Sequence, residues 1–436
     1  APLRTQVEGL EIGVSLALAV QSVGIQLDPP SLSHPRSDAE NLLQHINQLG
    51  DLEARVVDID LLRELSEKLR DWDWRCTAYL RGGEVIAVSR PGSKPLGLAV
   101  DLGSTKIAGY LVDLDSGKTL AAQGIMNPQI NYGEDIVSRL TYAMKSPSGR
   151  EKLTEAVIEA LYQLVQDLCA EVGAAPEEIL EAVVVGNTAM HHLLLGLPVR
   201  QLALAPFVAA SSGHLDLKAR DIGLNLAPGA YVHLPPNIAG YVGSDHVAML
   251  MATAAGWSHQ HVLALDIGTN TEISLITAGG EITSLSCASG PAFEGYHIHD
   301  GTRATRGAIE RVLITPDEVY YQTIEGAPAS GICGSGILDA VAQLHLAGVL
   351  NNKGRIEMGA HTRVRQDGDQ PVFLLAGEEG RKEITVTQHD IREIQLAKAA
   401  IQTGIQVLMA ESGVSVEEID RVIIAGAFGS YIDVPN

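Results

Sequence analysis

The sequence has few aromatic residues and few basic ones, and each shortage excludes a class of partner. Phe, Trp and Tyr make up only 4% of the 436 residues, so the chain offers few flat side chains on which single-stranded nucleic acid could stack. Its 31 Lys and Arg stand against 53 Asp and Glu, which gives a formal net charge of −22. Nucleic acid and anionic membranes repel such a chain, and we expect neither as a partner.

Cysteines and long apolar runs are scarce as well. No apolar stretch reaches the roughly 20 residues that a membrane-spanning helix needs, and no signal peptide is visible. The cysteines lack the spacing of a zinc site or an iron–sulfur cluster; they are Cys76, Cys169, Cys287 and Cys333. We expect them to be small buried side chains in a reducing compartment, so the predicted location is the cytoplasm.

Against this background, two stretches carry the same motif, over 98–113 and 263–277. Each reads as an apolar strand, an Asp-x-Gly-hydroxyl turn and a second apolar strand. Glycine at such a bend lets backbone N–H groups approach phosphate oxygens, and Mg²⁺ prefers oxygen ligands such as the Asp at the strand end. The first hairpin contributes Asp101, Gly103, Ser104, Thr105 and Lys106; the second contributes Asp266, Gly268, Thr269, Asn270, Thr271 and Glu272. We therefore predict that Asp101 and Asp266 bind Mg²⁺ and that the turns hold the phosphates of a nucleotide.

A third element lies near the end of the sequence, where a buried strand over 421–425 runs into a glycine-rich bend. The bend consists of Gly426, Ala427, Phe428 and Gly429. Because glycine has no Cβ, a flat adenine ring could lie against this backbone. The order of the three elements resembles the phosphate-1, phosphate-2 and adenosine motifs of the acetate and sugar kinase, Hsp70 and actin superfamily of ATPases, over roughly residues 97–436.

The resemblance implies an α/β fold with two ribonuclease-H-like lobes around a nucleotide cleft. We expect a small α+β domain over 1–90, a linker over 91–97, a first lobe over 98–260 with an insertion near 200–260, and a second lobe over 261–436. In the superfamily a hinge joins the lobes, and Gly334 and Ser335 stand where one connecting segment would lie. We assign both residues to the nucleotide site. The alternative is that they simply begin an ordinary helix.

Several segments narrow the resemblance to one family: 28–31, 96–106, 127–139, 186–192, 289–295 and 425–430. They resemble the ATP-dependent reductive activators of corrinoid proteins, which return an inactive Co(II) corrinoid to Co(I). The resemblance implies ATP and Mg²⁺ as cofactors and a homodimer. It also implies a corrinoid protein as partner, either a corrinoid iron–sulfur protein or one of a methyltransferase system. Typical members carry an N-terminal [2Fe–2S] domain, which this chain lacks, and this chain matches their ATPase and partner-docking parts.

Some points stay open from the sequence. Glu272 and Glu294 are both candidates for the catalytic base. A small-molecule kinase, an activator of acyl-CoA dehydratases and a nucleotide-gated assembly protein are the alternative functions. We also expect further segments at both ends, because the chain begins at Ala1 rather than Met and stops where a helix after the adenosine turn should begin.

Overall fold

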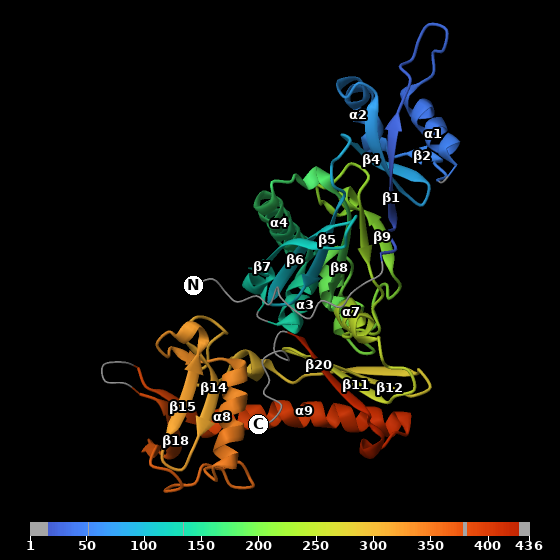
Figure 1. The fold of residues 1–436 in the computed structure, drawn as a ribbon. Coiled ribbons are helices and arrows are strands. Elements are labelled where there is room, and N and C mark those ends of the chain that lie inside the picture. The colour runs from blue at the N-terminus through green and yellow to red at the C-terminus, as the bar shows by residue number, and fades with distance from the viewer. Residues whose placement is uncertain (1–15, 51, 134, 378–381, 427–436) are drawn as a thin grey trace. The chain divides into compact units, whose positions relative to one another are not determined.

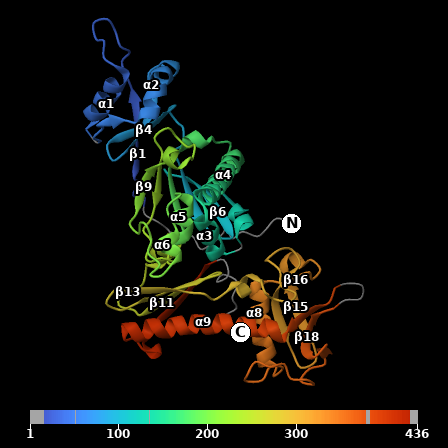
Figure 2. The ribbon, with the colours of Figure 1, turned by 180° about the vertical axis from the view of Figure 1, so that it is seen from behind.

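The computed structural model describes residues 16–50, 52–133, 135–377 and 382–426. The chain divides into two compact units, and each is described by itself. The N-terminal unit extends to Ala248, and the C-terminal unit begins at Met249. Figures 1 and 2 show the elements of both units from opposite sides.

The N-terminal unit begins with a small α+β domain. Its sheet has the order β1-β3-β4-β2, formed by β1 (Val20–Gln26), β2 (Val56–Val57), β3 (Arg75–Arg81) and β4 (Glu84–Ser89). Its helices are α1 (Asp38–Leu49) and α2 (Ile59–Asp71). The side chain of Ser37 caps α1, and that of Asp58 caps α2. Apolar residues at helical spacing in α2, Leu61, Leu65 and Leu69, form part of the domain's core.

The first lobe follows with a six-stranded sheet in the order β7-β6-β5-β8-β10-β9. Its strands are β5 (Leu96–Leu102), β6 (Lys106–Asp113), β7 (Thr119–Met126), β8 (Ile179–Gly186), β9 (Leu215–Lys218) and β10 (Tyr231–Leu234). Strands β5, β6 and β7 are antiparallel neighbours, whereas β8 pairs in parallel with β5. The segment 200–260, which the sequence suggested as an insertion, supplies β9 and β10 to this sheet.

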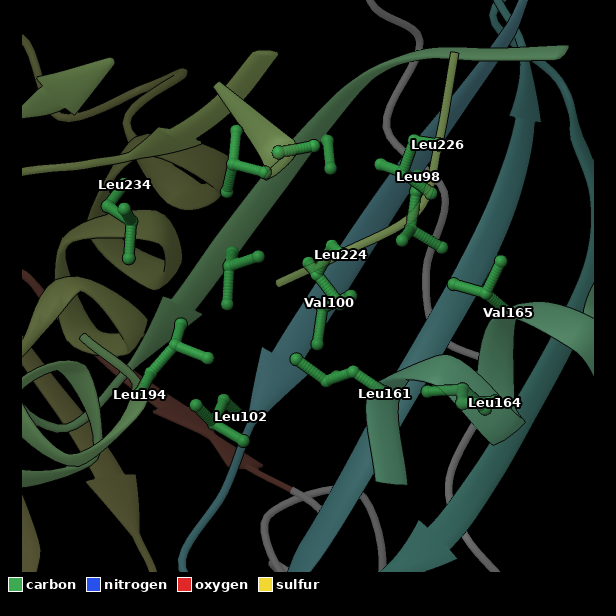
Figure 3. Packing of buried hydrophobic residues seen from close by; sticks show 14 of the residues in the cluster. Leu98, Val100, Leu102, Leu161, Leu164, Val165, Leu194, Leu224, Leu226 and Leu234 are labelled. Carbon is green, nitrogen blue, oxygen red and sulfur yellow. The ribbon is translucent and has the colours of Figure 1, made fainter. Parts of the chain in front are cut away.

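Helices complete the first lobe. They are η1 (Pro128–Tyr132), α3 (Ile136–Lys145), α4 (Pro147–Val172), η2 (Pro176–Glu178), α5 (Thr188–Leu194), α6 (Arg200–Ala203), η3 (Ala219–Ile222) and α7 (Ser244–Thr253), which crosses into the second unit. The long helix α4 packs on β6 and β7. Figure 3 shows Leu161, Leu164 and Val165 of α4 facing Leu98 and Val100 of β5 in the core. This packing fixes the strand that carries Asp101.

The C-terminal unit repeats the central part of this design. Its four-stranded sheet has the order β13-β12-β11-β20, with β11 (Val262–Ile267), β12 (Thr271–Ile276), β13 (Ile282–Cys287) and β20 (Arg421–Ala425). As in the first lobe, the first three strands are antiparallel and the fourth pairs in parallel with the first. Helix α9 (Gln388–Ser412) packs along the sheet, as both Figures 1 and 2 show.

Between β13 and α9 the C-terminal unit contains two smaller sheets. One has the order β15-β14-β16 and the other β17-β18-β19. The elements are η4 (Pro291–Glu294), β14 (Ala308–Ile314), β15 (Val319–Thr323), η5 (Ile324–Gly326), β16 (Gly331–Ile332), α8 (Gly334–Leu346), β17 (Val364–Asp367), β18 (Gln370–Ala376) and β19 (Ile384–Thr387); η6 (Val416–Glu418) precedes β20. Helix α8 packs on β14 and η4 and so joins this region to the segment after β13.

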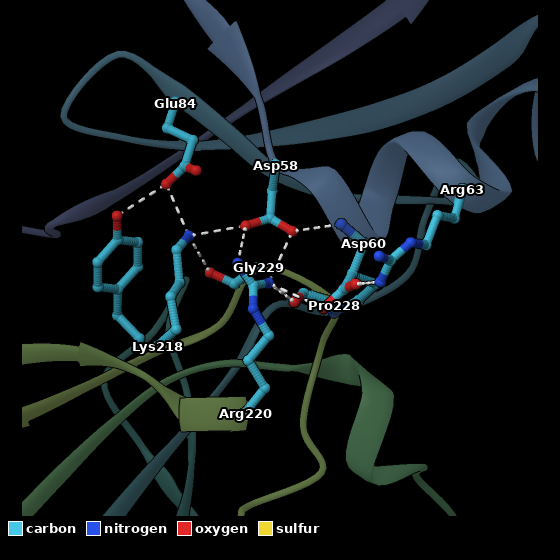
Figure 4. Close-up of polar contacts among 9 residues, drawn as sticks. Asp58, Asp60, Arg63, Glu84, Lys218, Arg220, Pro228 and Gly229 are labelled. Carbon is cyan, nitrogen blue, oxygen red and sulfur yellow. Dashed lines mark hydrogen bonds and ion pairs between the residues drawn. The ribbon is translucent and has the colours of Figure 1, made fainter. Parts of the chain in front are cut away.

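An ion-pair network around the buried carboxylate of Asp58 joins the small domain to the first lobe (Figure 4). Arg220 donates to both oxygens of Asp58, at 2.9 and 3.0 Å, and Lys218 Nζ lies 2.7 Å from Glu84. Burial alone would raise the pKa of Asp58, but hydrogen bonds from Arg220 and Lys218 outweigh it and hold that pKa below its usual value. Breaking one partner of such a buried pair typically costs about 3–5 kcal/mol, so the network anchors the small domain.

The structure also bears on the expectations for apolar helices and for the cysteines. No helix in the described part of the chain is long and apolar enough to cross a membrane. All four cysteines are free and buried, as the sequence predicts. Burial raises the pKa of the Cys76 and Cys169 thiols to about 11, so both stay protonated near neutral pH.

Candidate nucleotide site

The first predicted hairpin is formed by β5 and β6. Asp101, near the end of β5, lies opposite Ala108 of β6, and its side chain is exposed. The turn after β5 begins at Gly103, where an added Cβ would lie 2.5 Å from the carbonyl oxygen of Lys106. Only glycine fits this turn without displacing the backbone, since real Cβ atoms essentially never approach so closely. The turn therefore needs Gly103 for its shape.

The second hairpin is formed by β11 and β12 and carries two carboxylates. Asp266 of β11 lies directly opposite Glu272 of β12, and opposed residues of an antiparallel pair point to the same face of the sheet. Burial raises the pKa of Asp266 to about 6. Glu272 is buried and accepts a hydrogen bond from Ser286 Oγ at 3.0 Å. The hairpin thus holds two acidic side chains on one face, where the first hairpin holds one.

The other candidate base, Glu294, lies beside the turn of the second hairpin. It ends η4, and its carboxylate accepts a hydrogen bond from the hydroxyl of Thr269. Thr269 is one of the residues predicted to hold phosphate. The structure therefore brings Glu294 to the predicted phosphate turn, and it places Glu272 within the strand beside Asp266.

Gly426 is the part of the predicted adenosine bend that the structure describes. It follows β20 with φ +86°, in the left-handed region that favours glycine. An added Cβ there would lie 2.6 Å from Asp266 Oδ1. The backbone after β20 thus passes close to the carboxylate of Asp266. The remaining predicted residues of the bend, Ala427, Phe428 and Gly429, lie outside the described residues.

Gly334 and Ser335 form the first turn of α8. An added Cβ at Gly334 would lie 1.6 Å from the carbonyl oxygen of Phe293, so this glycine permits close packing against the segment that carries Glu294. The hydroxyl of Ser335 lies 3.3 Å from the thiol sulfur of Cys333. These contacts account for the small residues here. A role of the pair in nucleotide binding stays a prediction.

Sequence reasoning gave no role in the site to two residues that contact the turns. Asn127 follows β7, and its side-chain amide donates to the carbonyl oxygen of Gly103 at 2.9 Å. Ser289 follows β13, and its hydroxyl lies 2.8 Å from that of Thr271. Each stands one or two residues before a proline that opens a short 3₁₀ helix. Both residues could have been recognised in the sequence, because a polar residue followed by a proline comes after the third strand of each repeat.

The residues present fit a magnesium nucleotide. Each hairpin, taken by itself, carries hydroxyl groups and backbone N–H groups of the kind that bind phosphate. Each also carries, at the end of its central strand, a carboxylate of the hard oxygen type that Mg²⁺ prefers. Glycine at position 426 lets the backbone pass close to the carboxylate of Asp266, where an added Cβ would clash with it. No group of three or more His, Cys, Asp or Glu within the described ranges could hold a metal by itself.

Comparison with known proteins accounts for nearly the whole chain. Three family models match it: the RACo linker region over residues 9–94, the RACo middle region over 96–257, and the C-terminal domain of RACo, the ASKHA domain, over 260–436. A solved structure titled reductive activator for corrinoid, iron–sulfur protein is 35% identical, covers 98% of this chain and 70% of its own, and superposes with a TM-score of 0.84. This chain belongs to the RACo family.

Two curated relatives are similar to this RACo family chain. The corrinoid activation enzyme RamQ of Eubacterium limosum is 37% identical over 87% of this chain and 66% of its own length. A Co(II) methylated amine-specific corrinoid protein reductase of Methanosarcina barkeri is 25% identical over 78% of this chain and 64% of its own length. The chain therefore spans about two thirds of these relatives. Membership confirms the predicted α/β fold of the actin-like, ASKHA type.

Proposed function

We propose that this chain is the ATPase and partner-docking part of a reductive activator that returns a protein-bound Co(II) corrinoid to Co(I). The observation that carries the proposal is the repeated hairpin, with an Asp at the end of the central strand in each lobe and an oxygen-rich turn after it. The names of the relatives support the corrinoid protein as partner. By the same resemblance we propose a homodimer, with a [2Fe–2S] domain in the part of the relatives that this chain does not span.

In the proposed ATP site, both lobes would contribute residues. Gly103, Ser104, Thr105 and Lys106 would hold phosphate oxygens from the first lobe, and Gly268, Thr269, Asn270 and Thr271 would hold them from the second. Asp101 and Asp266 would hold Mg²⁺, which supplies charge neutralisation for the phosphates when it is bound. Gly426 to Gly429 would hold the adenosine. Catalysis at such a site is mostly positioning and electrostatic stabilisation.

The contacts of the two glutamates suggest different roles. Glu294 is bound to the hydroxyl of Thr269, so its carboxylate lies at the phosphate turn, where an attacking water would also lie. Glu272 is buried within the strand and bound to Ser286. We therefore assign proton acceptance to Glu294 and positioning of Asp266 to Glu272.

ATP can assist the reduction only by changing which conformations bind the partner. For a one-electron step, each ~59 mV uphill lowers the equilibrium constant tenfold, which is about 1.4 kcal/mol. A switch between two conformations from 1:99 to 99:1 needs about 5.5 kcal/mol of differential binding. Closure of the lobes on Mg-ATP would supply this difference if the closed form binds the corrinoid protein more tightly. ATP hydrolysis then returns the chain to its open form.

The test is phosphate release from Mg-ATP by this chain, with and without a Co(II) corrinoid protein. We expect the corrinoid protein to stimulate release, and we expect Asp266→Asn to lower both the basal and the stimulated rate about 10²–10³-fold. A non-hydrolysable ATP analogue should also raise the affinity for the corrinoid protein. Unstimulated turnover together with unchanged affinity would contradict the proposal and favour a small-molecule kinase or an assembly ATPase.

A further inference from the structure

In each lobe, the segment that follows the third strand of the repeat donates hydrogen bonds to the proposed phosphate turn. In the first lobe, the side-chain amide of Asn127 donates to the carbonyl of Gly103 at 2.9 Å, and its backbone N–H donates to the carbonyl of Thr105 at 3.0 Å. Asn127 is 1% exposed. One buried residue thus binds two carbonyls of the turn, one through its side chain and one through its backbone.

The second lobe has the same arrangement built from different residues. The hydroxyl of Ser289 lies 3.4 Å from the carbonyl oxygen of Gly268 and 2.8 Å from the hydroxyl of Thr271. A serine hydroxyl has one proton, so Ser289 donates to Gly268 and accepts from Thr271. The next backbone N–H, that of Gly290, donates to the carbonyl of Thr269 at 3.1 Å. In both lobes, therefore, a side chain binds the carbonyl of the turn glycine, and a backbone N–H binds a second carbonyl of the same turn.

From this match we infer that Asn127 and Ser289 are positioning residues, each of which orients the phosphate turn of its own lobe. The inference rests on the proposed ATP site. A carbonyl oxygen directed at a bound phosphate would repel it, whereas backbone N–H groups attract it. By drawing the turn carbonyls toward themselves, Asn127 and Ser289 keep these oxygens directed away from the anion.

The first test measures amide hydrogen exchange of the two turns without nucleotide, so it does not depend on activity. Ser289→Ala should accelerate exchange over 268–271 about fivefold or more, because loss of one hydrogen bond costs about 1 kcal/mol, and leave 103–106 unchanged. Asn127→Asp keeps the oxygen that accepts from Gln129 but replaces the amide donor. It should accelerate exchange over 103–106 alone. Exchange that is unchanged in its own turn would overturn the inference.

The second test separates positioning from a merely structural role. Turn N–H groups contact the phosphates in ground state and transition state alike, so loosening them should raise KM for Mg-ATP about fivefold and leave kcat within about twofold. Ser289→Thr, which keeps the hydroxyl, should restore KM. Loss of folded protein would instead lower the apparent kcat at constant KM, and that result would contradict the assignment.

Ser284→Ala is the matched control for Ser289→Ala. Ser284 lies within β13, the strand that precedes Ser289. Its hydroxyl also contacts another hydroxyl, that of Ser274 in β12 at 2.6 Å, but this contact is away from the turn. It should change neither the exchange of 268–271 nor KM. An equal effect in this control would overturn the inference, since general loosening of β13 would then explain both. If no nucleotide binds at all, the proposed function fails, while the exchange measurement still decides the inference.

Discussion

The two hairpins share a topology but differ in the chemistry that they carry. Asp101 is exposed and lies opposite Ala108, whereas Asp266 lies in more buried surroundings, opposite Glu272, and burial raises its pKa to about 6. The duplicated sheet therefore supplies the same backbone position twice but concentrates acidic side chains in the second lobe. We infer that the first lobe mainly binds the phosphates and that the second carries most of the chemistry.

The turns of the two hairpins differ in a complementary way. A Cβ at Gly103 would lie 2.5 Å from the backbone oxygen of Lys106, whereas a Cβ at Gly268 meets its nearest atom, the oxygen of Asn270, only at 3.3 Å. Glycine is thus required in the first turn by the turn itself. In the second turn a Cβ would be tightly packed but would need only a small shift of its neighbour, so we expect glycine there to matter more for the close approach of a ligand.

The largest expected effect comes from removing the strand-end carboxylates one at a time. Asp266→Asn should lower kcat for ATP hydrolysis about 10²–10³-fold, the typical loss for a preorganised electrostatic group. Asp101→Asn should lower it at most about tenfold, because water screens an exposed charge. Steady-state phosphate release measures both. Equal losses would contradict the division of roles between the lobes, and unchanged circular dichroism would show that both variants fold.

The turn glycines give the next effect, on stability. Gly103→Ala should destabilise the N-terminal unit by about 1–3 kcal/mol, the usual penalty for an overpacked site. Gly268→Ala should change the stability of the C-terminal unit by less than about 1 kcal/mol and raise KM for ATP instead. Denaturant unfolding and steady-state kinetics on the same two variants would separate the effects. The comparison fails if Gly268→Ala is the more destabilising.

Much of this arrangement could be predicted from the sequence, and the reasons are local. The strands that carry Asp101 and Asp266 are continuous apolar runs bounded by turn residues, so their ends are visible in the pattern. The roles of Asn127 and Ser289 were not visible. They depend on contacts between segments that lie 24 and 21 residues apart. Such contacts follow from the sheet order, which hydrophobic periodicity does not determine.

Buried histidines should make the stability of the two units depend differently on pH. His191 in α5 is 2% exposed, neither ring nitrogen has a hydrogen-bond partner among the described residues, and burial lowers its pKa to about 4. His361 in the C-terminal unit is also buried, but it bonds to the Thr315 carbonyl and the Arg363 N–H. Only the unfolded chain takes up the proton of His191 between pH 6.5 and 4. Stability present above pH 6.5 is therefore lost as the pH falls through this range.

The expected loss from His191 is about 2 kcal/mol between pH 7 and pH 5. Denaturant unfolding at both pH values, followed by hydrogen exchange in each unit, would measure it. His191→Leu cannot titrate and should reduce the pH dependence of the N-terminal unit while leaving that of the C-terminal unit unchanged. Part of the dependence should remain, because burial also lowers the pKa of His192 and lowers that of His246 to about 4. If the two units lose stability in parallel and His191→Leu makes no difference, the histidine does not account for the asymmetry.

The smallest expected effect concerns Glu272, which has only Ala108 as its counterpart in the first lobe. Its carboxylate is buried and bound to Ser286, so we expect it to position Asp266 rather than to take a proton from water. Glu272→Gln should lower kcat about tenfold, which corresponds to about 1.4 kcal/mol for one weakened charge-assisted hydrogen bond. Loss of a general base costs about 10²–10⁴-fold, and we expect Glu294→Gln to fall at the lower end of that range, about 10²-fold. If Glu272→Gln instead causes the larger loss of kcat and Glu294→Gln the smaller one, Glu272 is the proton acceptor. Proton transfer would then occur between β11 and β12 rather than at the turn.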